Sequence, residues 1–440
     1  MPLASQLGRM AAVRVDKREI FGWAMFDFAN SSYTTVIVTV VYAVVFPKVI
    51  VGDAPEFRRG NLLFSLSLAA TYLLVVVSAP LLGALMDFRA AKKRFLFGSY
   101  LGTILATLAL GLAGPGDIAL AMGLLVLSNF GFSIGESFVA SFLPELGDKE
   151  SLGRISGLAW GLGYIGGLMS TMGVLVAVGP LELENASRLR LVGPLTALFF
   201  GVAAIPTFLF LKERGTPRAL PAGKSLAAVA FAQVARTARA LPRLRDLSLF
   251  MVSLFFAMAG LGIVISFAFI YGDQVVRWRA SIQVAMFVLT NLSAAVGALL
   301  FGLVQDRWGN MKTYRLTLIV WCVAVLGIYE TRRLSSLTGL SAEYVYLVVG
   351  ALAGLCLGAT QSAGRTVVAV LSPPDNTAEM FGFWGMVGKL AAAVGLVGLG
   401  LLQSAFGLEN AILLCALLFG AAYLAASRVD EQRGAAQALG

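Results

Sequence analysis

Hydrophobic residues occur along the chain in twelve long blocks that are separated by shorter polar connections. A bilayer core about 30 Å thick is crossed by about 20 apolar residues in a helix, and the blocks are near that length. The predicted spans are approximately 20–46, 62–85, 95–113, 118–143, 155–178, 192–211, 248–271, 283–303, 314–329, 344–370, 380–403 and 410–426. The pattern therefore predicts an all-α polytopic membrane protein.

Composition supports this prediction and excludes other classes. Of the 440 residues, 58% are hydrophobic and 13% are charged, whereas a soluble domain has about 25% charged residues. A soluble enzyme, a nucleic-acid-binding domain and a disordered chain are all poor explanations of these values. The chain has no histidine, and its three cysteines, Cys322, Cys356 and Cys415, lie in apolar stretches. We therefore expect no metal site and no cofactor.

The loop charges predict how the chain is oriented. If the N-terminus is cytoplasmic, the inside segments carry 23 of the lysines and arginines and the outside loops carry 9. Basic residues gather on the cytoplasmic side of membrane proteins, so both termini are expected there. The same rule accounts for the net charge of +10 without nucleic acid as a partner. The expected location is a bacterial inner membrane.

The longest connection, 212–247, divides the chain into two sets of six spans. It contains three prolines, and between them a helix-compatible stretch in which Arg236, Arg239 and Arg243 recur at helical spacing. We interpret this stretch as a basic amphipathic helix on the membrane surface, with a regulatory or partner-binding segment as the alternative. The predicted units are a bundle over 1–211, this linker, and a bundle over 248–440.

Two connections at corresponding places repeat one another. GALMDFRAAKKRF begins at Gly83, and GLVQDRWGNMKTY begins 219 residues later at Gly302. Each glycine would let helices approach closely, and each aspartate could cap a neighbouring helix or pair with a base. The pattern resembles the loop signature of the major facilitator superfamily, although Phe88 and Ala90 depart from it in the first copy. The candidate gating residues are Gly83, Asp87, Arg89, Gly302, Asp306, Arg307 and Gly309.

Other segments resemble one branch of this superfamily. They are 21–48, 141–167 and 357–389, and the most specific pieces are DFANS at 27–31 and LPEL at 143–146. They are similar to the vacuole effluxers, which include the fungal autophagy-related vacuolar amino-acid exporter and bacterial relatives. The resemblance implies twelve helices in two pseudo-symmetric six-helix bundles, alternating access, and efflux of amino acids or similar solutes.

Four charged residues lie within the predicted spans, namely Asp27, Glu136, Arg365 and Lys389. At 1.5 Å per residue they are roughly 8–14 Å from the cytoplasmic ends of their helices. An ionisable group in a span is expensive, so each is a functional candidate. Three interpretations remain open. The charges form ion pairs that close the cytoplasmic side, or an acid exchanges protons while a base holds an anionic substrate group, or the side chains snorkel to the surface.

Uncharged polar residues on the same spans are further candidates for substrate binding. These are Asn30, Tyr33, Asn129 and Gln361, beside Ser31, Ser32 and Ser362, with interhelical hydrogen bonds as the alternative for each. Phe381, Phe383 and Trp384 could stack on a substrate, or they could belong to an interfacial aromatic belt.

We interpret the chain as a monomeric secondary active transporter for a small polar or zwitterionic solute, with amino acids as the first candidates. Because no histidine is present, proton coupling would fall on Asp27 and Glu136, while Arg365 and Lys389 would bind the substrate. The alternative is an exporter of amphiphilic compounds, lipids or drugs. No nucleotide-binding loop and no nucleophile constellation occur, so the chain is not expected to be an enzyme.

Overall fold

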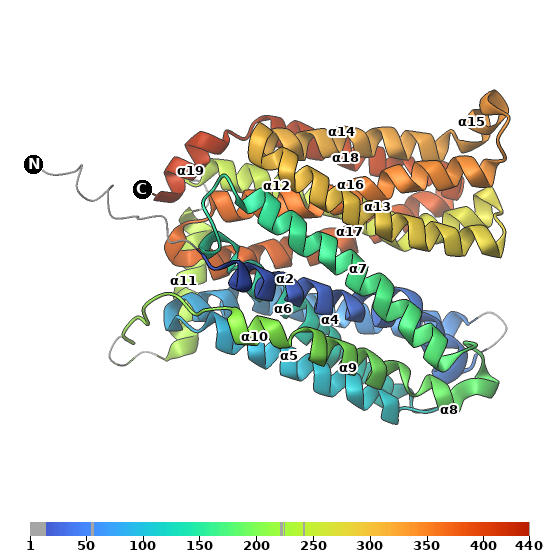
Figure 1. The fold of residues 1–440 in the computed structure, drawn as a ribbon, viewed down its shortest axis with the longest axis horizontal. Helices are drawn as coiled ribbons and strands as arrows, with labels where there is room; N and C mark the ends of the chain where they lie inside the picture. Colours follow the sequence, from blue (N-terminus) through green and yellow to red (C-terminus); the bar gives the residue numbers. More distant parts are fainter. Residues whose placement is uncertain (1–14, 54–56, 221–222, 224, 241–242, 440) are drawn as a thin grey trace, which may run out of the picture.

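A computed structural model describes residues 15–53, 57–220, 223, 225–240 and 243–439, and within these ranges the chain contains helices and no β-strand (Figure 1). The helices of the first half are α2 (Lys17–Tyr33), α3 (Tyr42–Val45), α4 (Arg58–Arg89), α5 (Lys92–Ala109), α6 (Ile118–Ala140), α7 (Leu152–Val178), α8 (Ala186–Leu189), α9 (Val192–Ala203) and α10 (Ile205–Phe210). The linker forms α11 (Leu226–Ala240). The second half contains α12 (Arg245–Tyr271), α13 (Ala280–Trp308), α14 (Asn310–Tyr329), α15 (Thr331–Thr338), α16 (Ala342–Leu371), α17 (Thr377–Ala411), α18 (Leu413–Ser427) and α19 (Glu431–Leu439).

Eleven helical stretches of the described chain are long and apolar enough to cross a membrane, and a bent pair makes a twelfth. The pair consists of Ala405–Ala411 and Leu413–Ser427, which meet at 62°. Within the shorter helix of the pair, Gly407 has a positive φ of 78°, a conformation that glycine tolerates without steric cost. The prediction of an all-helical protein with twelve spans is therefore confirmed, with the last span broken rather than straight.

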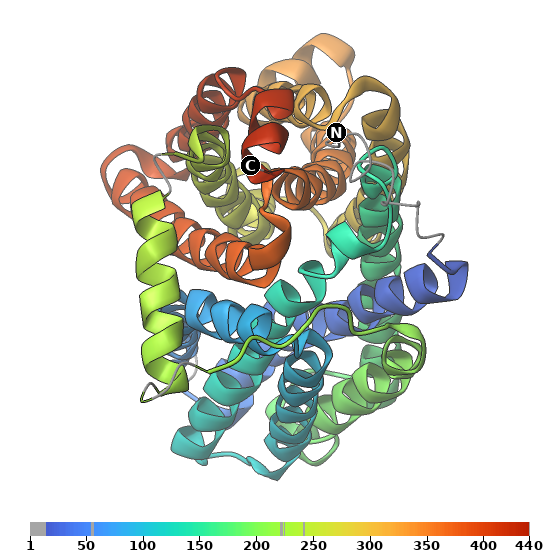
Figure 2. The same cartoon turned by 90° about the vertical axis from the view of Figure 1, so that its left-hand side faces the viewer.

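The spans run side by side, and the two halves of the chain lie on opposite sides of the molecule (Figure 2). The first described residues and α19 lie at the same end, together with α11, and we call this the terminal end (Figure 1). The opposite end is called the distal end. Across the boundary between the halves, α4 packs against α17 and α7 packs against α13. The division into bundles over 1–211 and 248–440 that move separately stays a prediction.

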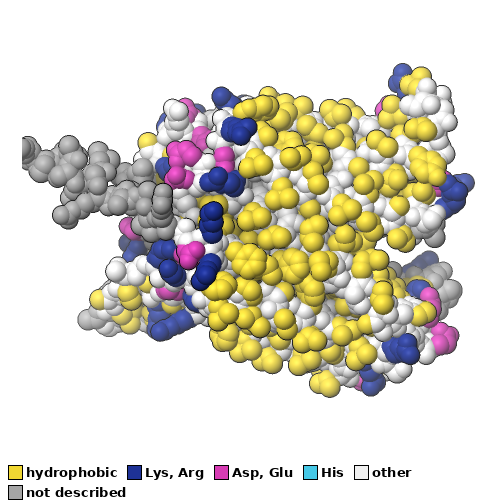
Figure 3. Space-filling view, viewed as in Figure 1, with side chains coloured by type: hydrophobic (Ala, Val, Ile, Leu, Met, Phe, Trp, Pro, Cys, Tyr) yellow, Lys and Arg dark blue, Asp and Glu magenta, His cyan; other side chains and the backbone are white. Residues whose placement is uncertain are grey.

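The outer surface suits a bilayer. Apolar side chains cover the middle of the molecule, and the visible charges gather toward its two ends (Figure 3). Many large hydrophobic side chains are exposed along the spans, among them Leu73, Val176, Leu198 and Leu401. Their exposure would be unfavourable in water and is favourable against lipid tails, so this band marks the membrane-spanning region.

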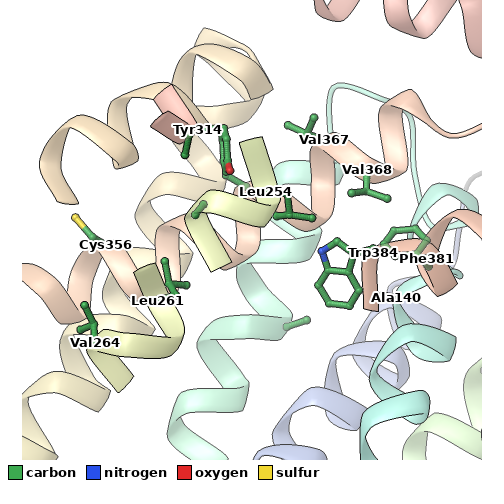
Figure 4. Packing of buried hydrophobic residues seen from close by; sticks show 14 of the residues in the cluster. Ala140, Leu254, Leu261, Val264, Tyr314, Cys356, Val367, Val368, Phe381 and Trp384 are labelled. Atoms are coloured by element: carbon green, nitrogen blue, oxygen red, sulfur yellow. The ribbon is translucent and has the colours of Figure 1, made fainter. Parts of the chain in front are cut away.

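The interior is packed with apolar side chains that join helices of both halves. Phe381 and Trp384 of α17 are buried, and their rings meet edge to face at 5.9 Å. They lie among Leu254 of α12, Val368 of α16 and Ala140 of α6 (Figure 4). The interpretation of Phe381 and Trp384 as an interfacial aromatic belt is therefore wrong, because both side chains are enclosed by other helices and do not reach the lipid surface.

The duplication extends beyond the two repeated loops. In the first half, Arg214 forms an ion pair with Glu19, and in the second half Arg433 forms one with Asp246. Arg214 and Arg433 are 219 residues apart, the same spacing as between the repeated loops. Each pair ties the segment after the sixth span of its half to the start of the first span. Each half thus has an ion pair of the same kind at the terminal end.

Candidate functional site

Both repeated aspartates cap a helix of the opposite half. The Asp87 carboxylate accepts hydrogen bonds from the backbone N–H groups of Ala378 (3.1 Å) and Glu379 (2.8 Å) in the first turn of α17. The Asp306 carboxylate accepts from the backbone N–H of Arg154, at 3.2 and 3.3 Å, in the first turn of α7. These N–H groups have no partner within their own helix, and the helix dipole favours an acid there. Each aspartate therefore holds the two halves together at the terminal end.

The repeated glycines allow the helices to come close beside these caps. A Cβ atom on Gly83 would collide with the backbone of Ala378, and one on Gly302 would collide with the backbones of Gly153 and Gly157. The basic residues Arg89 and Arg307 lie exposed next to the caps, and Gly309 takes a positive φ of 97° at the second loop. The close approach thus requires glycine at both positions.

A lysine of the first loop adds a third link. The Lys92 ammonium donates to the Glu145 carboxylate at 2.6 Å and to the Thr377 hydroxyl at 2.7 Å. Glu145 belongs to the LPEL segment after α6, and Thr377 begins α17. Lys92 is buried, so these partners compensate its charge. The link joins the first half to the second at the terminal end.

Deeper in the membrane region, Asp27 of α2 and Arg365 of α16 form an ion pair between the halves. The Arg365 Nη1 donates to Asp27 Oδ2 at 2.6 Å, and the two side chains are only 2% and 11% exposed. Arg365 also donates to the Ser156 hydroxyl (3.1 Å) and to the Ser156 carbonyl (3.0 Å). The Ser156 hydroxyl in turn donates to the carbonyl of Ser362 at 3.0 Å. The guanidinium is therefore held by three hydrogen bonds.

Two tryptophans complete the surroundings of Arg365. Its guanidinium carbon lies 4.7 Å from the ring centre of Trp23 and 5.3 Å from that of Trp160. Arginine stacks favourably on aromatic faces, especially where water is excluded. The Arg365 guanidinium is thus packed between two aromatic rings as well as hydrogen-bonded, so the ion pair with Asp27 is a rigid contact.

A second ion pair joins the halves through Glu136 of α6 and Lys389 of α17. Its nitrogen and oxygen are 3.8 Å apart, and the Lys389 and Glu136 side chains are 20% and 27% exposed. The Lys389 ammonium lies 5.5 Å from the ring centre of Tyr72 and 5.6 Å from that of Phe132. At 3.8 Å the two groups attract one another without forming a short hydrogen bond. This pair is looser and more accessible than the first.

The two pairs belong to one cluster. Glu136 lies near Asp27 and Arg365 as well as near Lys389, and it also lies near Tyr164. The Tyr164 hydroxyl accepts a hydrogen bond of 2.8 Å from the Gln361 amide of α16. The structure therefore brings the four predicted charges together with Gln361 at the boundary of the halves.

Three other candidates lie nearby in different roles. Tyr33 is buried, shares a 2.7 Å hydrogen bond with Ser128, and stacks on Phe132 with ring centres 5.0 Å apart. Asn30 and Asn129 are buried, and among the residues that the structure describes the Asn30 Oδ1 and Asn129 Nδ2 atoms have no hydrogen-bond partner. Tyr33 thus supports the ring beside Lys389 and does not face the charges itself.

Sequence reasoning missed the contribution of α7. Ser156, Trp160 and Tyr164 follow one another at intervals of four, so they lie on one face of this helix. That face contacts Arg365 and Gln361 of the opposite half. The spacing of four residues could have identified this face, but the many glycines of the span indicate helix packing more strongly.

The distal end differs from the terminal end. Its ion pairs Lys48–Glu182, Arg279–Glu343 and Arg332–Glu409 each join residues of the same half. At this end the surface is hollowed between the two halves (Figure 3). The caps, the Lys92 link and the two deep pairs all lie from the terminal end to the middle of the spans. The two halves are therefore held in contact with one another toward the terminal end.

Across the residues that the structure describes, no group of three or more histidine, cysteine, aspartate and glutamate residues could hold a metal ion. The groups that are present are paired charges, hydroxyls, an amide and aromatic rings. They can bind a polar or charged solute and exchange protons.

This fold defines a class. The chain is similar to solved transporters of the major facilitator superfamily over nearly its whole length. One is a bacterial homologue of the iron transporter ferroportin in an outward-facing state, with 14% identity, a TM-score of 0.70, and coverage of 94% of this chain and 99% of that one. Another is the human organic anion transporter MFSD10 (TETRAN), with 18% identity, a TM-score of 0.68, and coverage of 93% and 99%. The protein has the major facilitator fold.

The family follows from sequence. Residues 148–439 match the family described as vacuole effluxer Atg22 like, and the chain belongs to this family. It is 23% identical over 381 residues to the uncharacterized MFS-type transporter YxiO of Bacillus subtilis (strain 168), covering 85% of each chain. It is 25% identical over 304 residues to autophagy-related protein 22-1 of Emericella nidulans, covering 65% of this chain and 51% of that one. The chain thus spans about half the length of this fungal relative. The expectation of a transporter in this family is confirmed.

Proposed function

We propose that the protein is a proton-coupled secondary transporter that moves a small zwitterionic solute, with amino acids as the first candidates. The observation that carries the proposal is the cluster of two acids from the first half and two bases from the second half. Its charges cancel, as do those of a zwitterion, and it lies where both halves can act on a bound solute.

Within this cluster, the Glu136–Lys389 pair is the proposed contact with solute and proton. The pair is separated by 3.8 Å and is partly accessible, so a solute ammonium could replace Lys389 at Glu136 while a solute carboxylate binds Lys389. Tyr72 and Phe132 offer ring faces to a cation at the same place. Protonation of Glu136 would then release the solute ammonium.

The terminal end is proposed to face the cytoplasm. The positive-inside bias of 23 to 9 supports this orientation. In that case the contacts between the halves at the terminal end close the path to the cytoplasm. Labelling of Ser225→Cys in cells tests the orientation, since the exposed position 225 should react only after the membrane is permeabilised. Labelling of intact cells from outside would overturn it.

Uptake into proteoliposomes tests the function. Purified protein should accumulate radiolabelled amino acids when a pH gradient is imposed, and a protonophore should abolish accumulation. Lys389→Met should lose this activity, whereas the control Lys149→Met, an exposed lysine in the loop after α6, should retain it. If no amino acid accumulates under either condition but amphiphilic compounds do, the alternative of an amphiphile exporter replaces the proposal.

A further inference from the structure

The linker helix α11 lies across the molecule at the terminal end. It is seen lengthwise in Figure 2, whereas the spans are seen more nearly end-on, so its axis runs roughly parallel to the membrane plane. One side of the helix is buried, and its residues are Val229, Ala230, Gln233 and Thr237. Because this side is occupied by protein contacts, the position of the helix is set by the bundle.

Those contacts reach both halves. α11 packs against α4 of the first half. The Gln233 amide donates to the Glu379 carboxylate of α17 at 2.9 Å. Upstream, the Arg218 backbone N–H donates to the Phe88 carbonyl and its side chain donates to the Asp375 carbonyl. The helix is therefore held at the edge of the bundle with its opposite side turned away from it.

That opposite side is apolar and basic. Ala227, Phe231 and Ala235 recur every four residues and are all exposed, with the Phe231 side chain at 62%. Arg239 is also exposed and adjoins this stripe, four residues after Ala235, whereas Arg236 lies further round the helix, toward Glu379 of α17. Residues 219–244 contain four lysines and arginines and no acid.

We propose that this exposed side of α11 binds the anionic phospholipid surface of the leaflet at the terminal end. Phe231 inserts among the lipids, and Arg239 binds the phosphate headgroups. The physical basis is charge complementarity. Each arginine near an anionic leaflet gains electrostatic energy, and an aromatic side chain on a helix in the membrane plane gains by leaving water. The proposal is independent of the transported solute.

Photo-crosslinking in the full-length protein tests the proposal. A p-benzoylphenylalanine residue is placed at Phe231, and in a control variant at Glu150, an exposed position in the loop after α6. The protein is reconstituted in phosphatidylcholine vesicles with and without phosphatidylglycerol. Mass spectrometry should find lipid adducts at position 231, more with phosphatidylglycerol, and fewer at position 150.

Charge variants sharpen the test. Arg239→Gln should lower the yield of lipid adducts at position 231 by about fivefold in anionic vesicles. The control variants Lys149→Gln and Arg428→Gln, which remove exposed charges elsewhere, should leave the yield unchanged. Equal lipid yields at positions 231 and 150, or adducts at 231 mainly to another protein chain, would overturn the proposal.

Discussion

The two ion pairs between the halves have the same charges but different construction. Asp27–Arg365 has a 2.6 Å contact, and Arg365 makes further hydrogen bonds to Ser156 between two tryptophan rings. Glu136–Lys389 has a 3.8 Å separation, and its side chains remain partly accessible. A fully satisfied arginine has little capacity left for a solute, whereas the looser pair can accept new partners. We therefore infer that the Asp27–Arg365 pair holds the two halves together and that the Glu136–Lys389 pair exchanges solute and protons.

Removal of Arg365 should have the largest effect on stability. Arg365→Met leaves the buried Asp27 carboxylate without its partner, and we expect a loss of about 3–5 kcal/mol. Asp27→Asn in the same chain should recover part of this loss, because the unpaired charge is removed. Thermal unfolding of the two single variants and the double variant measures the coupling. If Arg365→Met costs no more than Lys389→Met, the distinction between the pairs fails.

Removal of the two helix caps should lower stability, as loss of the Asp27–Arg365 pair does. Asp87→Asn and Asp306→Asn should each cost about 0.5–2 kcal/mol and favour opening of the terminal end. The larger effect is expected for Asp87, whose hydrogen bonds of 2.8 and 3.1 Å are shorter than those of Asp306. Distances between spin labels on α4 and α17 report the opening. Unchanged distances and a wild-type transport rate in both variants would contradict a gating role.

Changes at the exchange pair should affect transport much more than stability. For Glu136→Gln and Lys389→Met we expect smaller losses than for Arg365→Met, because this pair is longer and its side chains are partly accessible. Glu136→Gln should abolish accumulation driven by a pH gradient and spare part of the solute exchange. Uptake and counterflow measured on the same vesicles separate these activities. Full accumulation by both Glu136→Gln and Asp27→Asn would exclude proton coupling through these acids.

The smallest effect is expected at the turn beside Asp87. Ala90 takes a left-handed φ of 47°, whereas the corresponding position of the second loop is Gly309 with a φ of 97°. Ala90→Gly should raise stability by about 0.5–1 kcal/mol, because glycine adopts this conformation without strain. Gly309→Ala should lower it. Melting temperatures of both variants provide the measurement, and a destabilised Ala90→Gly variant would contradict the explanation.

Much of the fold was predictable from local patterns. The length and apolarity of each block determine whether it can span a bilayer, so twelve spans could be read along the chain. The repeated loops placed Asp87 and Asp306 where each could cap a helix, and the structure places both at helix starts. The 62° bend between Ala411 and Leu413 was missed, because the residues there are apolar and include no glycine or proline that would indicate a break.

The sequence by itself determined the class of the protein, the duplication of its halves, and the presence of two acids and two bases at similar depths. Only the tertiary structure decided which acid faces which base, that Ser156 and Trp160 enclose Arg365, and that Trp384 is buried instead of facing lipid. The physical reason is that span length and loop charge are properties of each segment. Pairing depends on how helices from the two halves are rotated and placed against one another, and neighbouring residues in the sequence do not specify that.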